Sequence, residues 1–291
     1  MKRVLVVYKK SAYRIYVREY RHAGMASLLR SGDRAVRNLR RAHESHERTL
    51  RETRSVLRAL GASAVFRHRS DPGSAEPFDL VVTVGGDGTL LWASRLVGAG
   101  CPVIAINSAP SDSVGYFCAA SRTDMREALR AALAGELAET RLSRMRVVID
   151  GEQVATRVLN DVLFCHAVPA ATSRYAIQVR ARREEHRSSG VWIATAAGST
   201  AAIRSAGGRV LPLRSRQLQY CVREPYGQVR KPTLVHGSIG PGERLEILSQ
   251  MRRARLYLDG PRIWRTVEIG SRISVAVSDE PLSLLGFRSR R

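Results

Sequence analysis

Short runs of aliphatic and β-branched residues divide the first half of the chain and predict β-strands. These runs are residues 3–8, 63–66, 80–84 and 103–107. Residues from about 34 to 61 are rich in charge, with apolar positions recurring up to Gly61, which predicts a long, largely exposed helix. A capping box at Ser121 and Asp124 predicts a second helix, ended by Gly135. Strands that alternate with helices indicate a parallel sheet wound with helices.

The second half of the chain has a different sequence pattern, in which residues that signal helices are scarce. Asp150 and Gly151 stand between two alternating segments and predict a β-hairpin. The strands predicted here are residues 146–150, 153–158, 175–180, 191–194, 218–222, 244–248, 255–258 and 272–277. We therefore expect a Rossmann-like α/β domain at residues 1–135 and a β-rich, sandwich-like domain at 136–269. The tail at 270–291 could pack back on the first domain.

The formal net charge of +22 comes almost entirely from arginine and fits an anionic partner, either nucleic acid or a phosphate-rich ligand. The arginines are spread along the whole chain rather than gathered into one basic arm, so the charge permits such a partner without identifying it. The four cysteines form no CxxC pair, and the apolar run at residues 4–8 is too short for a signal-peptide core. These features predict reduced thiols, a cytoplasmic location and no membrane span.

The sharpest chemical feature is a glycine-rich turn, Gly-Gly-Asp-Gly-Thr at residues 85–89, between an apolar strand and a helix. Glycines there let backbone N–H groups approach phosphate oxygens, and the helix N-terminus adds partial positive charge. Thr89 is placed to cap the helix or to bind a phosphate. Asp87 would repel phosphates, so its carboxylate fits another role, as acceptor of a hydroxyl proton or as a magnesium ligand. The plainer alternative is a tight turn in which Asp87 binds only the local backbone.

Two further segments follow in order. Asn160 and Asp161 place an amide beside a carboxylate, which suits neighbouring hydroxyls, although the pair alone is an ordinary turn dipeptide. Residues 188–208 run from Ser-Ser-Gly through Gly-Ser-Thr-Ala-Ala to Gly-Gly. A strand meeting Gly198 and a short helix beyond it would present free N–H groups to a ligand, or would simply be a capped helix.

In this order, the three segments resemble those of NAD kinases. The Gly-Gly-Asp-Gly-Thr turn is also shared with lipid kinases that act on diacylglycerol and sphingosine, but their Gly-Asn-Asp segment is missing from this sequence. Ser-Ser-Gly at 188–190 and Val-Arg-Glu-Pro at 222–225 are similar to the mitochondrial branch of NAD kinases. The resemblance extends from about Arg3 to the turn at Asp259 and Gly260.

The resemblance implies transfer of the ATP γ-phosphoryl group to the 2′-hydroxyl of the adenosine ribose of NAD, with NADH as a second candidate acceptor. Asp87 would be the catalytic group, with Mg²⁺ or another divalent cation offsetting phosphate charge. The residues implied to bind phosphates or dinucleotide are Gly85, Gly86, Gly88, Thr89, Asn160, Asp161, Ser189, Thr200, Ala201 and Ser205. The family also implies a homodimer or homotetramer, and nucleic acid is not expected as a partner despite the charge.

Two positions depart from the family pattern. Ala202 stands where an aromatic residue is usual, and Ser189 stands where many members have an aspartate that contacts the nicotinamide end. A lipid or other small-alcohol kinase and a non-catalytic basic nucleic-acid-binding protein remain the alternatives. His43 and His46 are spaced for metal binding, but we expect them on a solvated helix face because that helix is polar all round.

Overall fold

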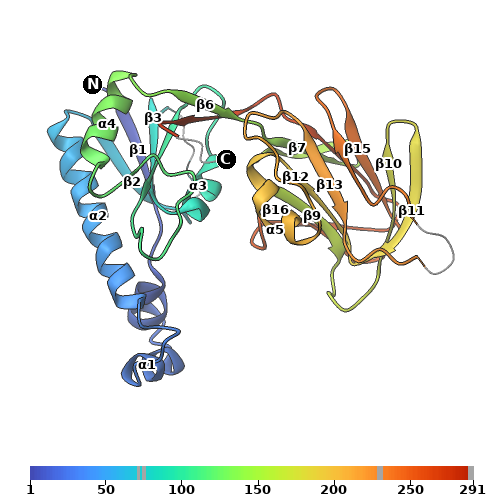
Figure 1. Cartoon of the computed structure of the whole chain (residues 1–291), viewed down its shortest axis with the longest axis horizontal. Helices are drawn as coiled ribbons and strands as arrows, with labels where there is room; N and C mark the ends of the chain where they lie inside the picture. Colours follow the sequence, from blue (N-terminus) through green and yellow to red (C-terminus); the bar gives the residue numbers. More distant parts are fainter. Residues whose placement is uncertain (71–72, 74–76, 228–231, 288–291) are drawn as a thin grey trace. The chain divides into compact units, whose positions relative to one another are not determined.

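A computed structural model describes residues 1–70, 73, 77–227 and 232–287. The chain forms two compact units (Figure 1), the first made of Met1–Thr140 with the described residues from Ser283 on, and the second of Arg141–Leu282. The sequence-based boundary lay at residues 135/136, whereas the units change at 140/141 and again at 282/283.

The described part of the first unit is built on a seven-stranded sheet with the order β2-β1-β3-β4-β19-β6, and β5 pairs with β4. The four strands β2, β1, β3 and β4 run parallel. The strand bounds are β1 Arg3–Tyr8, β2 Ser63–His68, β3 Leu80–Gly85, β4 Val103–Asn107, β5 Ala120–Ser121, β6 Glu139–Leu142 and β19 Leu282–Leu285. Every residue of β3 and β4 is buried, as expected for central strands covered on both faces.

Helices connect these strands. They are η1 Arg14–Glu19, α1 Ala23–Arg30, α2 Leu39–Ala59, α3 Asp87–Ser94 and α4 Met125–Ala134. Leu57 of α2 and Met125 and Leu129 of α4 share one core cluster with Val4 and Val82 of the sheet. Gly135 adopts a left-handed conformation with φ of 76°, so the predicted C-terminal end of α4 is confirmed. The N-terminal end differs, because the helix begins at Met125 with Asp124 as its cap residue, and of the predicted capping box only the bond from Ser121 N–H to the Asp124 carboxylate, at 2.8 Å, is present.

Helix α2 differs from the sequence prediction. It begins at Leu39 rather than near Arg34, and its buried side chains are mostly polar: His43, His46, Thr49, Thr53 and Leu57. The expectation that His43 and His46 lie on a solvated face is wrong, because they are only 4% and 1% exposed. A search for apolar periodicity does not find this buried face, because four of its five side chains are polar. Buried polar groups of this kind are stabilised by hydrogen bonds.

The second unit packs two six-stranded sheets, counted over its described residues, with the orders β11-β10-β15-β18-β7-β8 and β14-β13-β12-β9-β16-β17. Residues of both sheets, including Phe164, Ile193, Ile247 and Val275, belong to one core cluster, which makes the unit a β-sandwich. The strands are β7 Met145–Ile149, β8 Glu152–Val158, β9 Asp161–His166, β10 Ser173–Val179, β11 Arg182–Ser188, β12 Val191–Ala194, β13 Leu218–Val222, β14 His236–Ile239, β15 Arg244–Ser249, β16 Ala254–Leu258, β17 Trp264–Val267 and β18 Arg272–Val277. Two short helices, η2 Ala197–Thr200 and α5 Ala202–Ser205, follow β12.

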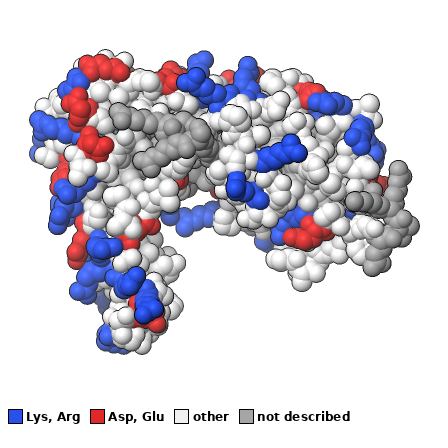
Figure 2. All heavy atoms as spheres, in the orientation of Figure 1, with Lys and Arg blue, Asp and Glu red and all other residues white. Residues whose placement is uncertain are grey.

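The predicted fold class, an N-terminal α/β unit and a C-terminal β-rich unit, is confirmed. Lys and Arg side chains are scattered over the visible surface of both units, in keeping with the dispersed arginines of the sequence (Figure 2). Among the described residues, none of the helices combines the length and apolar character needed to cross a membrane.

Candidate active site

The glycine-rich turn joins β3 to α3 at the carboxyl end of the parallel sheet. A Cβ added to Gly85 would lie 2.1 Å from Thr89 Oγ1, and one added to Gly86 would lie 2.3 Å from Ser113 Oγ. A Cβ on Gly88 would meet no described atom within 4 Å. Thr89 therefore requires glycine at position 85, whereas Gly86 lies against a serine hydroxyl and Gly88 opens the turn to a ligand.

Asp87 is the first residue of α3, and backbone groups hold its carboxylate in place. Its Oδ2 accepts a hydrogen bond from Tyr116 N–H at 2.9 Å, and its Oδ1 accepts one from Phe117 N–H at 2.8 Å. Each carboxylate oxygen has two lone pairs, so one acceptor position on each oxygen remains available. This arrangement fixes the orientation of the carboxylate while leaving it able to receive a proton from a hydroxyl group.

Thr89 does not cap α3 as one alternative predicted. The cap position is Gly86, which has no side chain to accept the helix N–H groups, and Thr89 instead donates its own N–H to Gly86 C=O at 2.8 Å. The Thr89 side chain is 1% exposed, and its hydroxyl has no hydrogen-bond partner among the described residues. A buried hydroxyl without a partner is unfavourable, so this atom can be satisfied by a ligand atom in the turn.

The loop at residues 107–118 wraps around the turn, a role that its sequence did not predict. Ser108 N–H donates to Gly85 C=O at 2.9 Å, and Asn107 Nδ2 donates to Ser113 C=O at 2.9 Å. Gly115, with φ of +56°, lies against Asn107, where a Cβ would be 2.3 Å from Nδ2. The available signal was a buried strand ending in Asn107, followed by small residues and a glycine.

His46 connects α2 to the same edge of the sheet. Its Nδ1 lies 2.9 Å from Ser108 Oγ, and its Nε2 lies 2.7 Å from the Lys9 carbonyl oxygen. Burial lowers the pKa of His46 to about 4, so the ring is neutral near pH 7. The Nε2 atom therefore donates to Lys9, and Nδ1 accepts from the Ser108 hydroxyl.

In the second unit, Asn160 and Asp161 lie at the start of β9 beside the turn at Asp259. The carboxylate of Asp259 accepts hydrogen bonds from Leu159 N–H at 3.1 Å and Asn160 N–H at 2.7 Å. The side-chain oxygen of Asn160 is buried, and no described residue gives it a hydrogen bond. This oxygen is an acceptor that a ligand hydroxyl can satisfy.

Asp161 is buried, with 6% of its surface exposed. Burial, with a further contribution from the negative charge of Asp259, raises the pKa of Asp161 to about 7. Asp161 therefore exchanges between its neutral and charged forms close to neutral pH, which is unusual for a carboxylic acid.

The Gly-Ser-Thr segment packs directly on the Asn-Asp pair. Ala194 of β12 pairs with Asp161 of β9, and Thr195 N–H donates to Asn160 C=O at 3.0 Å. A Cβ on Gly198 would lie 2.1 Å from the Asn160 carbonyl oxygen, so only glycine allows this approach. Beyond it, Thr200 and Ser205 are exposed and Ala201 is half-buried. The two predicted segments thus meet, and Asp259, which sequence reasoning left without a role, organises them from an Asp-Gly turn.

Ser189 lies apart from this group. It precedes β12, whose opposite end carries Ala194, the partner of Asp161, so the whole strand, roughly 13 Å long, lies between Ser189 and Asp161. Ser189 lines a cavity of about 360 Å³ on the outer face of β9 and β12, together with Cys165, Trp192 and Tyr257.

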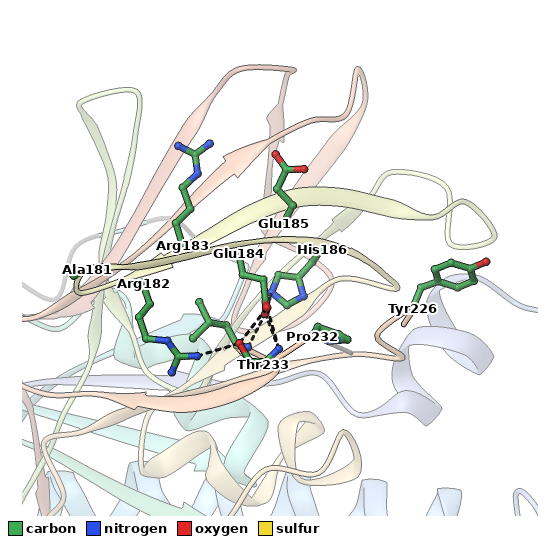
Figure 3. A pocket seen from close by; sticks show the side chains of 10 residues that line it. Ala181, Arg182, Arg183, Glu184, Glu185, His186, Tyr226, Pro232 and Thr233 are labelled. Atoms are coloured by element: carbon green, nitrogen blue, oxygen red, sulfur yellow. Dashed lines mark hydrogen bonds and ion pairs between the residues drawn. The ribbon is translucent and has the colours of Figure 1, made fainter. Parts of the chain in front are cut away.

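A separate cavity of about 620 Å³ lies along β11 (Figure 3), where Glu184 accepts hydrogen bonds from Thr233 N–H and Leu234 N–H. Its described lining includes none of the predicted site residues.

Asp87 is the only carboxylate within the glycine-rich turn, and the described residues contain no cluster of three or more His, Cys, Asp or Glu side chains arranged to hold a metal ion. Mg²⁺ commonly binds through one or two carboxylates plus substrate phosphates and water. One carboxylate beside a phosphate-binding turn fits this mode, in which the substrate supplies most of the ligands.

Comparison with known proteins agrees with this geometry. Residues 4–137 match the family model described as the ATP-NAD kinase N-terminal domain. An Oryza sativa subsp. japonica protein named "Probable NADH kinase" is 34% identical over 261 residues, covering 81% of this chain and 80% of that protein. The chain belongs to the NAD kinase family.

Members of the NAD kinase family are phosphotransferases with an alcohol acceptor, and the chain is such an enzyme. Solved structures of the family share its fold. The NAD kinase from Archaeoglobus fulgidus in complex with ATP has a TM-score of 0.67 at 20% identity, covering 99% of this chain and 94% of its own. Yeast NADH kinase complexed with NADH has a TM-score of 0.66 at 15% identity, covering 98% of this chain and 83% of its own.

Proposed function

We propose that this NAD kinase family enzyme transfers the γ-phosphoryl group of ATP to the 2′-hydroxyl of the adenosine ribose of NAD or NADH. The observation that carries the proposal is the Asp87 carboxylate, held by two backbone N–H groups at the mouth of an open glycine turn. A fixed carboxylate beside a phosphate-binding turn suits a reaction in which a hydroxyl group attacks a phosphoryl group.

In this proposal Asp87 accepts the proton of the attacking 2′-hydroxyl through an acceptor position that the backbone leaves available. The N–H groups of the turn, Gly86 and Gly88 included, hold the donor phosphates, and the Thr89 hydroxyl finds its missing partner in the bound ligand. A general base of this kind contributes about 10²- to 10⁴-fold to the rate.

The dinucleotide is held by residues of the second unit. Asn160 supplies a buried carbonyl oxygen without a partner, and Asp161 supplies a carboxyl group that can donate or accept near pH 7. Thr200, Ala201 and Ser205 lie on the exposed rim beside this pair. Ser189 acts on a more distant part of the ligand, because β12 separates it from Asp161.

We propose Mg²⁺, or another divalent cation, as the metal, with Asp87 as its protein ligand. The cation would offset negative charge on the donor phosphates. NADH is included as acceptor because the rice relative carries the name of an NADH kinase.

We further propose a homodimer or homotetramer in a reducing compartment such as the cytoplasm. The four free cysteines support the second part of this proposal. Size-exclusion chromatography with light scattering tests the assembly, and a monomer would contradict it.

The function is tested by an endpoint assay with purified protein, ATP, Mg²⁺ and either NAD or NADH, in which an NADP-specific dehydrogenase detects the product. Product with either dinucleotide is the expected result. The absence of product with both dinucleotides, and with polyphosphate in place of ATP, would favour the lipid-kinase or nucleic-acid-binding alternatives.

A further inference from the structure

Lys9 follows directly after β1 and lies at the same edge of the sheet as the glycine-rich turn. In the pairing of β1 with β3, Tyr8 is opposite Val84, so Lys9 is next to the position of Gly85. In the pairing of β3 with β4, Gly85 is opposite Asn107. Because these strands are parallel, their carboxyl ends bring Lys9, the glycine-rich turn and the start of the 107–118 loop together. Ligands of α/β sheets bind at this edge.

The backbone of Lys9 is anchored, which limits where its side chain can reach. His46 Nε2 donates to the Lys9 carbonyl oxygen at 2.7 Å, and the other ring nitrogen binds Ser108 Oγ at the start of the 107–118 loop. The same buried imidazole therefore holds both the residue after β1 and the residue after β4, on either side of the glycine-rich turn.

The side chain of Lys9 is half-buried, and its ammonium group forms no hydrogen bond or ion pair with the residues that the structure describes. Its neighbour Lys10 has the opposite arrangement, with Nζ 2.9 Å from the Glu19 carboxylate. A partly desolvated ammonium group without a counter-ion is unfavourable, so an anion at this position would be bound strongly.

The Lys9 ammonium and the Asp87 carboxylate both act on the thiol of Cys118. Burial raises the pKa of the Cys118 thiol to about 12, with the Asp87 carboxylate adding to the rise and the Lys9 ammonium opposing it. Burial also lowers the pKa of Lys9, and the nearby Arg69 guanidinium lowers it further, whereas Asp112 and Cys118 act in the opposite direction. One thiol thus lies within electrostatic range of both the carboxylate and the lysine.

We propose that Lys9 binds the phosphate chain of the phosphoryl donor beside the Gly-Gly-Asp-Gly-Thr turn. The inference rests on the proposed function and adds a residue to it. A donor is favoured over the dinucleotide because the N–H groups of the glycine-rich turn are proposed to hold the donor phosphates, and Lys9 lies at the same edge of the sheet as this turn. Lys9 supplies positive charge where Asp87 would otherwise repel the phosphates.

The test compares Lys9→Met with Lys10→Met. Methionine keeps an unbranched chain of similar length and removes the charge. Lys10→Met is the matched control, because it removes an adjacent lysine that is already paired with Glu19. Isothermal titration calorimetry measures the binding of ATP, inorganic tripolyphosphate and NAD to the whole protein, and melting temperatures report folding.

We expect Lys9→Met to weaken ATP and tripolyphosphate binding by about 10- to 100-fold, which is typical of a charge-assisted hydrogen bond. NAD binding should be unchanged, Lys9→Arg should restore most of the affinity for phosphate, and Lys10→Met should bind all three ligands as the wild type does. Unchanged ATP binding in a folded Lys9→Met variant would overturn the assignment, and so would an equal loss of ATP and NAD binding.

The calorimetry does not depend on turnover, so the two proposals can fail separately. A wild-type protein that makes no NADP(H) but binds tripolyphosphate through Lys9 would refute the proposed function and keep the phosphate site. A Lys9→Met variant with wild-type donor KM and affinity would refute the phosphate site and keep the function.

Discussion

The backbone of Asp259 donates a hydrogen bond to Asp161, whereas the side-chain carboxylate of Asp259 disfavours ionisation of Asp161. The N–H of Asp259 donates to the carbonyl oxygen of Asp161 at 2.9 Å, while the Asp259 carboxylate adds to the burial that raises the pKa of Asp161 to about 7. The turn that holds the Asn-Asp pair in position is thus also one cause of the raised pKa of Asp161.

This relationship predicts how stability depends on pH. An acid with a pKa near 4 when unfolded and about 7 when folded binds its proton more tightly in the folded state. Its contribution to stability is therefore lost as pH rises from about 4 to about 7. Asp161→Asn removes this ionisation, so its free energy of unfolding should improve relative to the wild type by on the order of 2–4 kcal/mol between pH 5 and pH 8.

Urea unfolding at several pH values measures this difference. Asp279→Asn, at an exposed position of the same unit, is the control and should follow the wild type at every pH. A constant difference between Asp161→Asn and the wild type across the range would show that Asp161 does not titrate in the folded protein between those values.

Asp87→Asn tests the proposed base. The amide cannot accept the hydroxyl proton, so kcat should fall at least 100-fold. The amide NH₂ group would also face either Tyr116 N–H or Phe117 N–H, which leaves one backbone donor without an acceptor. That loss costs about 1–3 kcal/mol, so the melting temperature should fall by several degrees without loss of the fold. The endpoint assay, circular dichroism and thermal melting report these effects, and near-normal turnover would refute the assignment.

Gly85→Ala and Gly88→Ala separate the folding requirement of the turn from its use in binding. Alanine at 85 would place its Cβ 2.1 Å from Thr89 Oγ1 and 2.7 Å from Thr89 Cβ, so this variant should be strongly destabilised. Alanine at 88 meets no described atom within 4 Å and has the higher helix propensity, so stability should be kept or improved by about 0.5–1 kcal/mol.

The new methyl group at 88 nevertheless occupies the open side of the turn. The KM for ATP should therefore rise in Gly88→Ala although the melting temperature does not fall. Steady-state kinetics and thermal melting give both values, and an unchanged KM would mean that donor phosphates do not approach this side.

His46→Leu should destabilise the first unit. The substitution leaves the Ser108 hydroxyl and the Lys9 carbonyl oxygen without their buried partner, which costs about 2–4 kcal/mol in total. His236→Leu, at an exposed position, is the control and should change the unfolding free energy by less than about 0.5 kcal/mol. Urea denaturation at pH 7 distinguishes the two, and equal stability would mean that the His46 hydrogen bonds contribute little.

The sequence predicted most of the regular structure because most elements follow hydrophobic periodicity. Strands β1, β4, β12, β13 and β18 match their predicted residues, and the hairpin at Asp150 and Gly151 is present. Strand β11 was missed because its sequence, Arg-Arg-Glu-Glu-His-Arg-Ser, carries no alternation of apolar residues. It lies at the edge of its sheet, where charged side chains face water and protect against pairing with other chains.

The candidate site shows a similar division. Asp87, Asn160 and Asp161 stand in recognisable local patterns, and sequence reasoning found them. The groups that orient them are two backbone N–H groups almost thirty residues beyond Asp87 and a carboxylate about a hundred residues beyond Asn160. Backbone donors carry no residue identity, and contacts across such separations depend on the tertiary fold.

The return of the chain to the first unit has a consequence for biosynthesis. The chain leaves that unit within β6 and re-enters it within β19, and these strands are neighbours in the sheet. The β-sandwich is continuous in sequence, so it can fold as soon as it has left the ribosome. The first unit must wait for β19, which follows the whole sandwich in the sequence. A nascent chain stopped at residue 281 would therefore hold a complete sandwich beside an α/β sheet that still exposes the edge of β4.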